Sequence, residues 1–325
     1  MQDRQKILQL LQEGKITVEQ ADLLIAAIED TSNVKATSAK GDKNPLDDLK
    51  NIGSQLSATI AQSLTELRRN VEQQWDNWSP FGGSPSVLAS TEMNLPESIQ
   101  NLFVETTNGE IQVVSWDEPY IRLYIRGRVK SESVLEGKRL LNQSLQVSQT
   151  ETNYELVVIH GGKDGVNQAS VDIYVPSSLK ALTLHSQNGH LQLEAAHIQD
   201  LQAETVNGSI SLSRVMAEKI RLVTHNGNVN VYSSITKETH NVYVSARNGT
   251  IDMKGIDATI PFTGTAKTAL GRVDISGEGW TVEYDDSLRK RSARFEQTPS
   301  YADPGMENTT RIFLETRHGG INVRG

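Results

Sequence analysis

Two aspartates form the one pair of acidic side chains that the sequence pattern places together. Asp252 and Asp274 lie 22 residues apart and hold the same outward position in successive copies of a repeated unit, so we expect them to be neighbours. A pair of carboxylates is the minimum for acid/base cleavage of a glycosidic bond. The equivalent positions of other copies hold Gln192, Ser211 and Asn230, so a polar, solvated face explains the acids better than an active site does.

Three histidines near the turns of the repeat could ligate a metal. His185, His190 and His225 lie at unlike positions relative to their turns, without a recurring ligand geometry. The chain has no cysteine, which removes disulfides, thiolate ligands and cysteine nucleophiles. It also lacks a phosphate-binding glycine motif, a nucleophile elbow and an HExxH motif. The sequence therefore predicts no catalytic residue, no cofactor and no metal site.

The repeated unit that positions these side chains is built around an Asn-Gly dipeptide. With the residue before each glycine taken as position zero, the copies centre on Asn108, Asn188, Asn207, Asn226, Asn248, Leu270 and His318. Spacings of 19, 19, 22 and 22 residues separate the centres from Asn188 to Leu270, and such a period indicates a stacked repeat. The predicted structural turns are Asn108, Gly109, Asn188, Gly189, Asn207, Gly208, Asn226, Gly227, Asn248, Gly249, Gly271 and Gly319. We expect positive φ at the glycines.

The segments on either side of each turn alternate between apolar and polar residues. Positions −6 and −4, and again +3 and +5, are apolar in nearly every copy, as in Leu182, Leu184, Leu191 and Leu193. This period of two predicts strands with one buried face. An antiparallel hairpin fits, because Asn-Gly between alternating apolar residues is a strong hairpin signal. We favour a β-solenoid, because Thr or Ser recurs at −2 and Asn at zero, as stacked ladders require.

Two stretches interrupt the repeat. Residues 120–160 contain extended segments and a hairpin turn at Thr152-Asn153, which we interpret as coils decorated by a hairpin. Residues 277–309 precede the last coil, at 312–323. We expect this insertion to cover the open end of the stack, because an uncapped end is an exposed strand edge. A functional loop is the alternative.

The first 80 residues have helical patterns. We predict a helix hairpin over 1–30, a linker over 31–43, a long amphipathic helix over 44–80 and a solenoid domain over 86–325. The candidate interaction face of the long helix is Leu49, Ile52, Leu56, Ile60, Leu64, Leu67, Val71, Trp75 and Trp78. It fits a coiled-coil seam, a lid along the solenoid or a membrane-surface face. We expect a protein partner or self-association through these helices, with a membrane surface as the alternative.

Composition limits the partners and the compartment. A formal net charge of −8 argues against a nucleic-acid partner, because phosphate binding needs concentrated Lys and Arg. The N-terminus has no apolar signal core, and no stretch approaches the roughly 18 apolar residues of a spanning helix. We therefore expect a cytoplasmic protein, with peripheral attachment to the membrane as an option.

The residues described so far resemble a known family. The Thr-x-Asn-Gly-x-Ile-x-Val style units, the entries at Leu95-Pro96 and Val175-Pro176 and the opening Glu13-Gly14-Lys15-Ile16-Thr17 are similar to the bacterial putative-adhesin domain joined to a SHOCT-like helical segment, as in YvlB/LiaX-type proteins. Leu270 in place of Asn and Gly264 in place of an inward aliphatic residue depart from the pattern. The resemblance implies a right-handed β-helix-like fold, a role in the cell-envelope stress response and no catalytic residues.

These observations together predict a mainly β fold, a single right-handed parallel β-helix-like solenoid with an N-terminal α-helical region. The predicted role is that of a non-enzymatic binding or scaffold protein in the envelope stress response. A surface adhesin and a carbohydrate-active β-helix enzyme are the alternatives. An adhesin requires export, and such an enzyme requires a clustered acidic groove.

Overall fold

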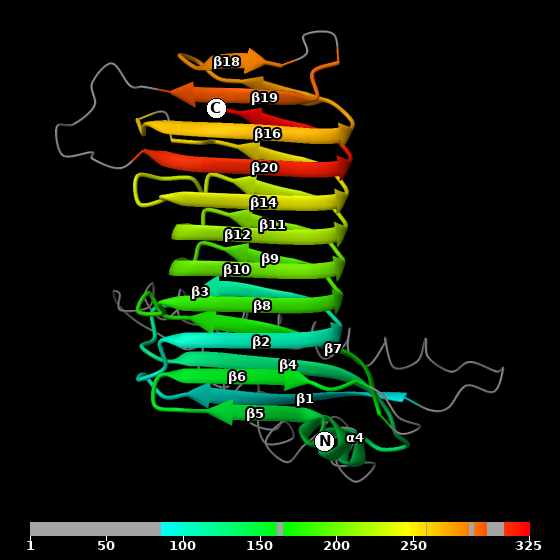
Figure 1. Ribbon diagram of the computed structural model, residues 1–325. Coiled ribbons are helices and arrows are strands. Elements are labelled where there is room, and N and C mark those ends of the chain that lie inside the picture. The colour runs from blue at the N-terminus through cyan, green and yellow to red at the C-terminus, as the bar shows by residue number, and fades with distance from the viewer. Residues whose placement is uncertain (1–85, 161–164, 258, 286–288, 298–308) are drawn as a thin grey trace, which may run out of the picture. The chain divides into compact units, whose positions relative to one another are not determined.

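The structure is a computed structural model that describes residues 86–160, 165–257, 259–285, 289–297 and 309–325. The predicted modules at 1–30, 31–43 and 44–80, with the candidate interaction face, lie outside the described residues. The described part is mainly β and forms two large sheets, which run as two stacks of strands along one axis (Figure 1).

Sheet A has ten strands in the order β1 (Ser86–Leu95), β4 (Ile121–Lys130), β7 (Val166–Val175), β3 (Ile111–Ser115), β9 (Leu191–Glu194), β11 (Ile210–Ser213), β13 (Val229–Tyr232), β15 (Ile251–Lys254), β21 (Ile321–Arg324) and β17 (Val273–Ser276) among the described residues. Sheet B likewise has eleven, in the order β18 (Thr281–Tyr284), β19 (Ser292–Gln297), β16 (Phe262–Leu270), β20 (Thr310–His318), β14 (Asn241–Asn248), β12 (Met216–Asn226), β10 (His197–Asn207), β8 (Ala181–Asn188), β2 (Asn101–Asn108), β6 (Asn153–Val158) and β5 (Leu145–Gln149). One helix, α4 (Val134–Gln143), is described.

Each copy of the repeat contributes one strand to each sheet. β8 ends at Asn188 in sheet B, and β9 begins at Leu191 in sheet A, so the two arms of the turn do not pair with each other. The hairpin alternative is therefore wrong, and the arms form one layer of a stack. Like residues stack in register, as Asn188 on Asn207 and Leu184 on Ala203 show.

The prediction of a single parallel solenoid is too simple. Parallel pairing holds through the middle layers, but β1, β4 and β7 pair antiparallel at one end of sheet A. β5 pairs antiparallel with β6, and β16, β19 and β18 pair antiparallel at the other end of sheet B. These antiparallel strands lie within or next to the two stretches that interrupt the repeat, where the alternation no longer specifies one strand per sheet.

The order of the layers also differs from the sequence order. The last coil does not follow the stack. β20 lies between β14 and β16, and β21 lies between β15 and β17 (Figure 1). The connection from β15 to β16 therefore passes the layer formed by β20 and β21. Ile256 and Ile260 in this connection are buried. Every layer offers the same backbone hydrogen-bonding edge, so the repeat alone does not specify which layer is whose neighbour.

The core lies between the two sheets and consists of the inward positions of the repeat. Leu182, Leu184, Leu191 and Leu193 are fully buried, as are their equivalents in the middle layers. Gly264 replaces an inward aliphatic residue because a neighbouring side chain fills its place. A Cβ at this position would lie 2.2 Å from the Phe295 ring, which is 2% exposed.

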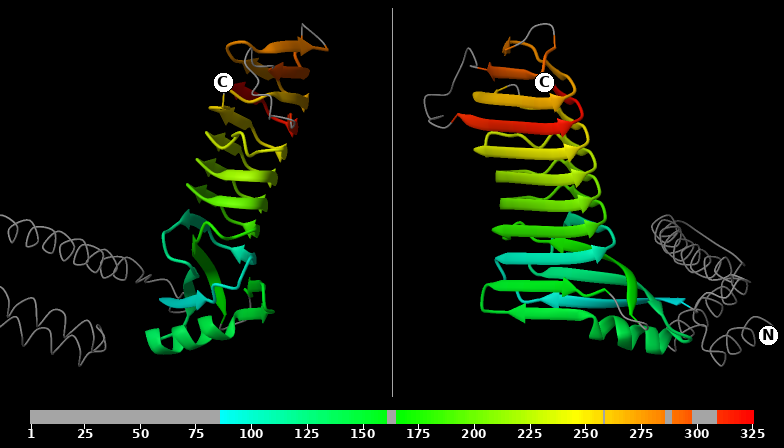
Figure 2. Two further views of the ribbon diagram at one scale, coloured as in Figure 1. Left: turned by 90° about the vertical axis from the view of Figure 1, so that its left-hand side faces the viewer. Right: turned by 45° about the vertical axis from the view of Figure 1, so that its right-hand side comes forward.

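Both ends of the stack are covered. At one end α4 packs on β1 and β4 and buries Leu141 (Figure 2). The sequence analysis did not predict this helix, although Ser133 caps it by accepting a hydrogen bond from the backbone N–H of Glu136. At the other end β18 and β19 extend sheet B, and Trp280 packs against Phe262 at a centroid distance of 4.9 Å. The described part of the 277–309 insertion therefore covers an open end, as the sequence predicts.

Candidate functional site

The asparagines at position zero form a hydrogen-bonded ladder along one corner of the stack. The side-chain amide of Asn188 donates to Asn108 at 2.8 Å, that of Asn207 to Asn188 at 2.8 Å, that of Asn226 to Asn207 at 2.8 Å and that of Asn248 to Asn226 at 2.7 Å. His318 continues the ladder, with Nδ1 2.8 Å from Oδ1 of Asn248. The Asn-Gly turns are thus held together by exposed side chains, and their polarity has a structural cause.

The glycines of these turns have a different role from the one we predict. Positive φ occurs at Gly109 (149°) and Gly319 (154°), and the remaining turn glycines, Gly189, Gly208, Gly227, Gly249 and Gly271, do not have it. At those positions the prediction of positive φ is wrong. A Cβ on Gly208 would lie 1.9 Å from the carbonyl oxygen of Gly189, so close backbone approach between layers requires glycine there. Positive φ occurs instead at the next corner of the middle layers, just after the strand in sheet A, at Ala195, Arg214, Ser233 and Gly255.

Hydroxyl groups at position −2 bond across the layers beneath the same corner. The donors and their acceptor carbonyls are Thr205 and Gly189 (3.0 Å), Thr224 and Gly208 (2.8 Å), Thr316 and Gly249 (3.0 Å), and Thr268 and Gly319 (2.9 Å). Ala246 lacks a hydroxyl and interrupts the series. These bonds explain why Thr or Ser recurs at a buried position, since a buried polar group needs a partner.

The side chains that we considered for chemistry do not form a catalytic group. Asn322 lies between Asp252 and Asp274 in sheet A, so the two aspartates are not neighbours. This correction follows from the insertion of β21 into the stack. Asp252 instead pairs with Lys254 at 3.2 Å.

The three histidines also lie apart, each with different neighbours. His185 packs edge-on against Phe103 at 5.1 Å between ring centroids, and Nδ1 of His190 accepts a hydrogen bond from the Ser209 N–H at 3.0 Å. His225 lies two layers away from His190, on β12. Among the described residues no group of His, Asp or Glu is arranged to hold a metal ion.

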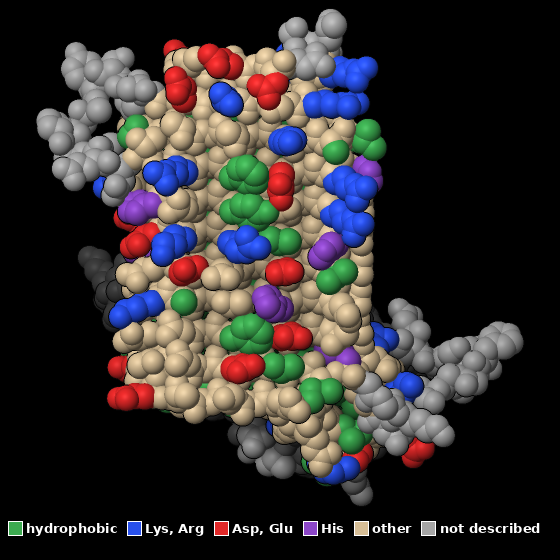
Figure 3. Space-filling view, in the orientation of Figure 1, with side chains coloured by type: hydrophobic (Ala, Val, Ile, Leu, Met, Phe, Trp, Pro, Cys, Tyr) green, Lys and Arg blue, Asp and Glu red, His purple; other side chains and the backbone are tan. Residues whose placement is uncertain are grey.

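An aromatic column crosses the outer face of sheet B, where the inserted strand β20 meets β14 (Figure 3). The Tyr243 and Phe313 rings stack at 5.5 Å between centroids with an interplanar angle of 5°. The Arg221 guanidinium covers the other face of Tyr243 at 4.7 Å. Glu315 accepts hydrogen bonds from the hydroxyls of Tyr243 (2.7 Å) and Ser245 (3.1 Å). Burial, and then the hydrogen bond to Glu315, raise the pKa of Tyr243, so the phenol stays protonated and acts as a donor.

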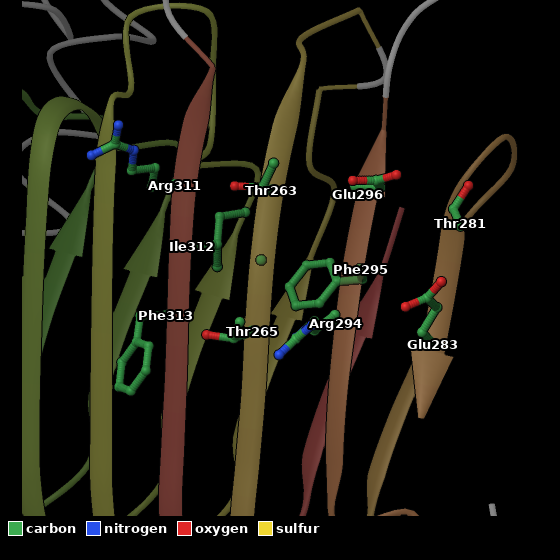
Figure 4. Close-up of a pocket in the computed structure, with 11 residues that line it drawn as sticks. Thr263, Thr265, Thr281, Glu283, Arg294, Phe295, Glu296, Arg311, Ile312 and Phe313 are labelled. Atoms are coloured by element: carbon green, nitrogen blue, oxygen red, sulfur yellow. The ribbon is translucent and has the colours of Figure 1, made fainter. Parts of the chain in front are cut away.

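A hollow of about 600 Å³ lies beside this column, around Thr263 and Thr265 on β16 (Figure 4). Phe313, Thr265 and Arg294 are consecutive in one outward row across the sheet. The small Thr265 side chain therefore lies between two larger side chains, the Phe313 ring and Arg294. Because Thr265 extends less far from the sheet than its two neighbours, a hollow forms above it. Because Tyr243 covers one face of Phe313, the opposite face lies toward the hollow, and Figure 4 shows Arg294 reaching from β19 toward Thr265.

Both basic and acidic side chains line the hollow. Arg294 and Arg311 contribute guanidinium donors, and Glu283 and Glu296 contribute carboxylate acceptors, around a floor that includes Thr263 and Thr265. Phe313 is 42% exposed, so part of its ring is open to solvent. The arrangement can hold a ring-shaped group against an aromatic face while hydrogen bonds fix its orientation.

Sequence reasoning missed this site because it depends on the order of the layers. If the layers followed the order of the sequence, Thr265 would lie beside Tyr243, and Phe313 would lie beyond the insertion. The available signal was the occurrence of aromatic residues at the same outward position of three copies, Phe103, Tyr243 and Phe313. That signal does not say which of these copies are adjacent.

Comparison with known proteins identifies the class to which this fold belongs. A model of the Toastrack DUF4097 family matches residues 99–284, and a model of the SHOCT-like domain matches residues 2–33. The chain belongs to the Toastrack DUF4097 family, and residues 2–33 before the Toastrack region are similar to the SHOCT-like domain.

The comparison with solved structures finds bacterial proteins of low sequence identity. A protein from Clostridium sporogenes, described as a "putative cell adhesion protein", is 12% identical, with a TM-score of 0.41, and the match covers 72% of this chain and 99% of that one. A "putative adhesin" from Bacteroides fragilis is 11% identical, with a TM-score of 0.39 and coverage of 73% and 96%. No curated protein matches the chain. No helix of the described part of the chain is long and apolar enough to span a membrane.

Proposed function

We propose that this protein is a non-enzymatic binding protein of the bacterial cell envelope, and that the hollow beside Phe313 binds a sugar ring of a cell-wall glycan. One observation carries the proposal. The outer face of sheet B has an aromatic ring, guanidinium donors and carboxylate acceptors around a hollow of about 600 Å³. Membership of the Toastrack family and the adhesin-like descriptions of proteins with a similar fold are in keeping with a binding role.

The chemistry of the hollow suits a glycan better than a purely apolar or purely charged ligand. One face of a hexose presents C–H groups, which pack on an aromatic ring such as Phe313. The hydroxyls of a sugar both donate and accept hydrogen bonds, so they need partners of both kinds. Arg294 supplies donors, and Glu283 and Glu296 supply acceptors.

The N-terminal part has a second role in this proposal. We infer that residues 1–80, including the SHOCT-like domain, associate with a protein partner or with a second copy of the chain. Envelope damage sensed by the Toastrack domain would then be reported to a stress-response system, in keeping with the role that the resemblance to YvlB/LiaX-type proteins implies. We propose a cytoplasmic location with peripheral attachment to the membrane. There the glycan within reach is the membrane-linked precursor of the cell wall, which carries the same sugar rings as the assembled wall outside the membrane.

The glycan proposal is tested by co-sedimentation of the full chain with purified peptidoglycan sacculi from which anionic polymers have been removed. Phe313→Ala is expected to reduce the bound fraction at least tenfold. Phe103→Ala is the matched control, because Phe103 lies in the same outward row of sheet B at the other end of the stack. Equal binding by wild type and Phe313→Ala, or equal loss in both variants, would contradict the proposed site.

Two further measurements separate the rival functions. Release of soluble sugar from the sacculi by the wild-type protein would show a carbohydrate-active enzyme. Cleavage of the protein by protease added to intact cells would show export and favour a surface adhesin over the cytoplasmic location.

For the helical region, light scattering on the full chain and on residues 86–325 tests self-association. If both are monomeric and neither captures a partner, the interaction role of residues 1–80 is wrong.

A further inference from the structure

Basic side chains gather at the asparagine corner in the C-terminal half of the stack. Position −1, just before this corner, is Arg247 on β14 and Arg317 on β20, and the next layer contributes Arg272 directly after its turn. The segment with Lys290 and Arg291 then runs along the same corner, because Thr268 donates its N–H to the Arg291 carbonyl at 2.8 Å and Val273 donates to that of Lys290 at 2.7 Å. We call these five residues the cationic corner.

The five cations form a line rather than a scattered group. They come from four successive levels of the stack, and neighbouring strands are about 4.8 Å apart. Arg247, Arg317 and Arg272 are exposed, whereas Lys290 and Arg291 are half-buried. Figure 3 shows basic side chains along one margin of the sheet B face at this end of the stack.

Two of these arginines oppose each other directly. Ala246 pairs with Thr316 and Asn248 pairs with His318, so Arg247 and Arg317 face each other between these pairs in register. Like charges in this arrangement destabilise a sheet. The protein has a net charge of −8, so a shortage of acidic residues does not explain why the pair is left uncompensated.

Acidic partners are absent at the cationic corner but present at other arginines. None of its five cations has a carboxylate within 4 Å in the described part of the chain, whereas Arg214 pairs with Glu194 and Arg126 pairs with Asp172. Glu315 lies on the same face of β20 as Arg317, but it accepts hydrogen bonds from Tyr243 and Ser245. Lys290 lies over the Tyr284 ring, with its ammonium 4.6 Å from the ring centroid. The donors that stay open to an external anion are therefore the guanidinium groups of the four arginines.

We propose that the cationic corner binds a linear phosphate polymer. Guanidinium groups bind phosphate through paired, charge-assisted hydrogen bonds. A line of cations over several levels matches a chain of regularly repeated negative charges, whereas a single small anion would contact one or two of them. A membrane surface fits less well, because Leu270 is the one large apolar side chain exposed at this corner among the described residues, and membrane-surface binding needs a broad apolar face.

The test measures binding of the full chain to inorganic polyphosphate and, separately, to poly(glycerol phosphate). These two probes distinguish the possible sources of the same phosphate chemistry. The variant is Arg247→Gln with Arg317→Gln, and the matched control is Arg126→Gln with Arg139→Gln. The control removes the same charge from exposed arginines that are already paired with Asp172 and Glu136.

The corner variant is expected to bind at least one of the polymers about tenfold more weakly, and the control is expected to stay within about twofold of wild type. The logarithm of the association constant decreases with the logarithm of salt concentration, and this dependence should become shallower by about 1.5 in the corner variant alone, because two phosphate contacts are lost. Orthophosphate at the same phosphate concentration should not compete, because it cannot contact several levels at once.

A second readout does not depend on the ligand. Arg317→Gln alone should raise the urea midpoint of unfolding, because it removes the repulsion from Arg247. The proposal is overturned if wild type binds neither polymer, if both double variants lose affinity equally, or if the corner dependence occurs only with phosphatidylglycerol vesicles. A lower urea midpoint for Arg317→Gln would also overturn it, because the premise of an uncompensated pair would be wrong.

Discussion

Replacing Gly208 by alanine tests how the asparagine corner is built. The new Cβ would lie 1.9 Å from the Gly189 oxygen, so the two layers must separate by more than 1 Å at this point. Three hydrogen bonds cross there, from the Gly189 N–H to Asn207 (3.1 Å), from the Thr205 hydroxyl to Gly189 (3.0 Å) and from the Asn207 amide to Asn188 (2.8 Å). At about 1 kcal/mol each, their loss should lower the free energy of unfolding by about 3 kcal/mol.

Two other glycines separate this clash from backbone strain. Gly279 has a φ of +76° with open space around its Cβ position, so Gly279→Ala should cost only the left-handed strain of about 1–2 kcal/mol. Gly320 has neither feature, because its nearest atom would lie 3.4 Å away, so Gly320→Ala should change stability by no more than about 0.5 kcal/mol. Urea unfolding followed by far-UV circular dichroism gives the three values. The reasoning fails if Gly279→Ala costs as much as Gly208→Ala, or if Gly208→Ala is as mild as Gly320→Ala.

Four further predictions concern the core, the hydroxyl ladder, the layer order and pH. Leu222→Ala should cost about 2–5 kcal/mol in urea unfolding because Leu222 is fully buried, while Gln202→Ala should be nearly neutral; equal costs would mean that the inward register is wrong. Thr224→Val should cost about 1–3 kcal/mol because the buried Gly208 carbonyl loses its hydroxyl donor, and a neutral result would show that this bond contributes nothing. Deletion of residues 309–325 removes an internal layer, so it should abolish cooperative unfolding; retention of the wild-type transition would refute the inserted position of β20. Burial lowers the pKa of His160. Its contribution to stability is therefore present above the unfolded pKa of about 6.5 and is lost as pH falls through the lower folded pKa. His160→Gln should flatten the dependence of the urea midpoint on pH over this window, and an unchanged profile would contradict this assignment.

The sequence by itself specifies the local arrangement of each layer. Alternation at positions such as Leu182 and Leu184 determines which side chains are buried, because a strand has a period of two and one face must leave water. The recurrence of Asn at zero and of Thr or Ser at −2 predicts stacking, and the ladders from Asn108 to Asn248 have the expected in-register geometry. Helix α4 could have been found from the Ser133 and Glu136 capping signal, but no repeat pattern pointed to it.

The tertiary structure alone decides which layers are neighbours. All layers present equivalent backbone edges, so the repeat is satisfied by any order, and the long insertion before β20 lets the last coil reach a position between β14 and β16. That order separates Asp252 from Asp274 by Asn322, stacks Phe313 on Tyr243 and places Arg317 opposite Arg247. The reason for glycine at Gly208 is likewise tertiary, because the carbonyl that excludes a Cβ belongs to the neighbouring layer. Residue types and spacing specify what each strand can contribute, whereas side chains more than 50 residues apart meet only after the layers have stacked.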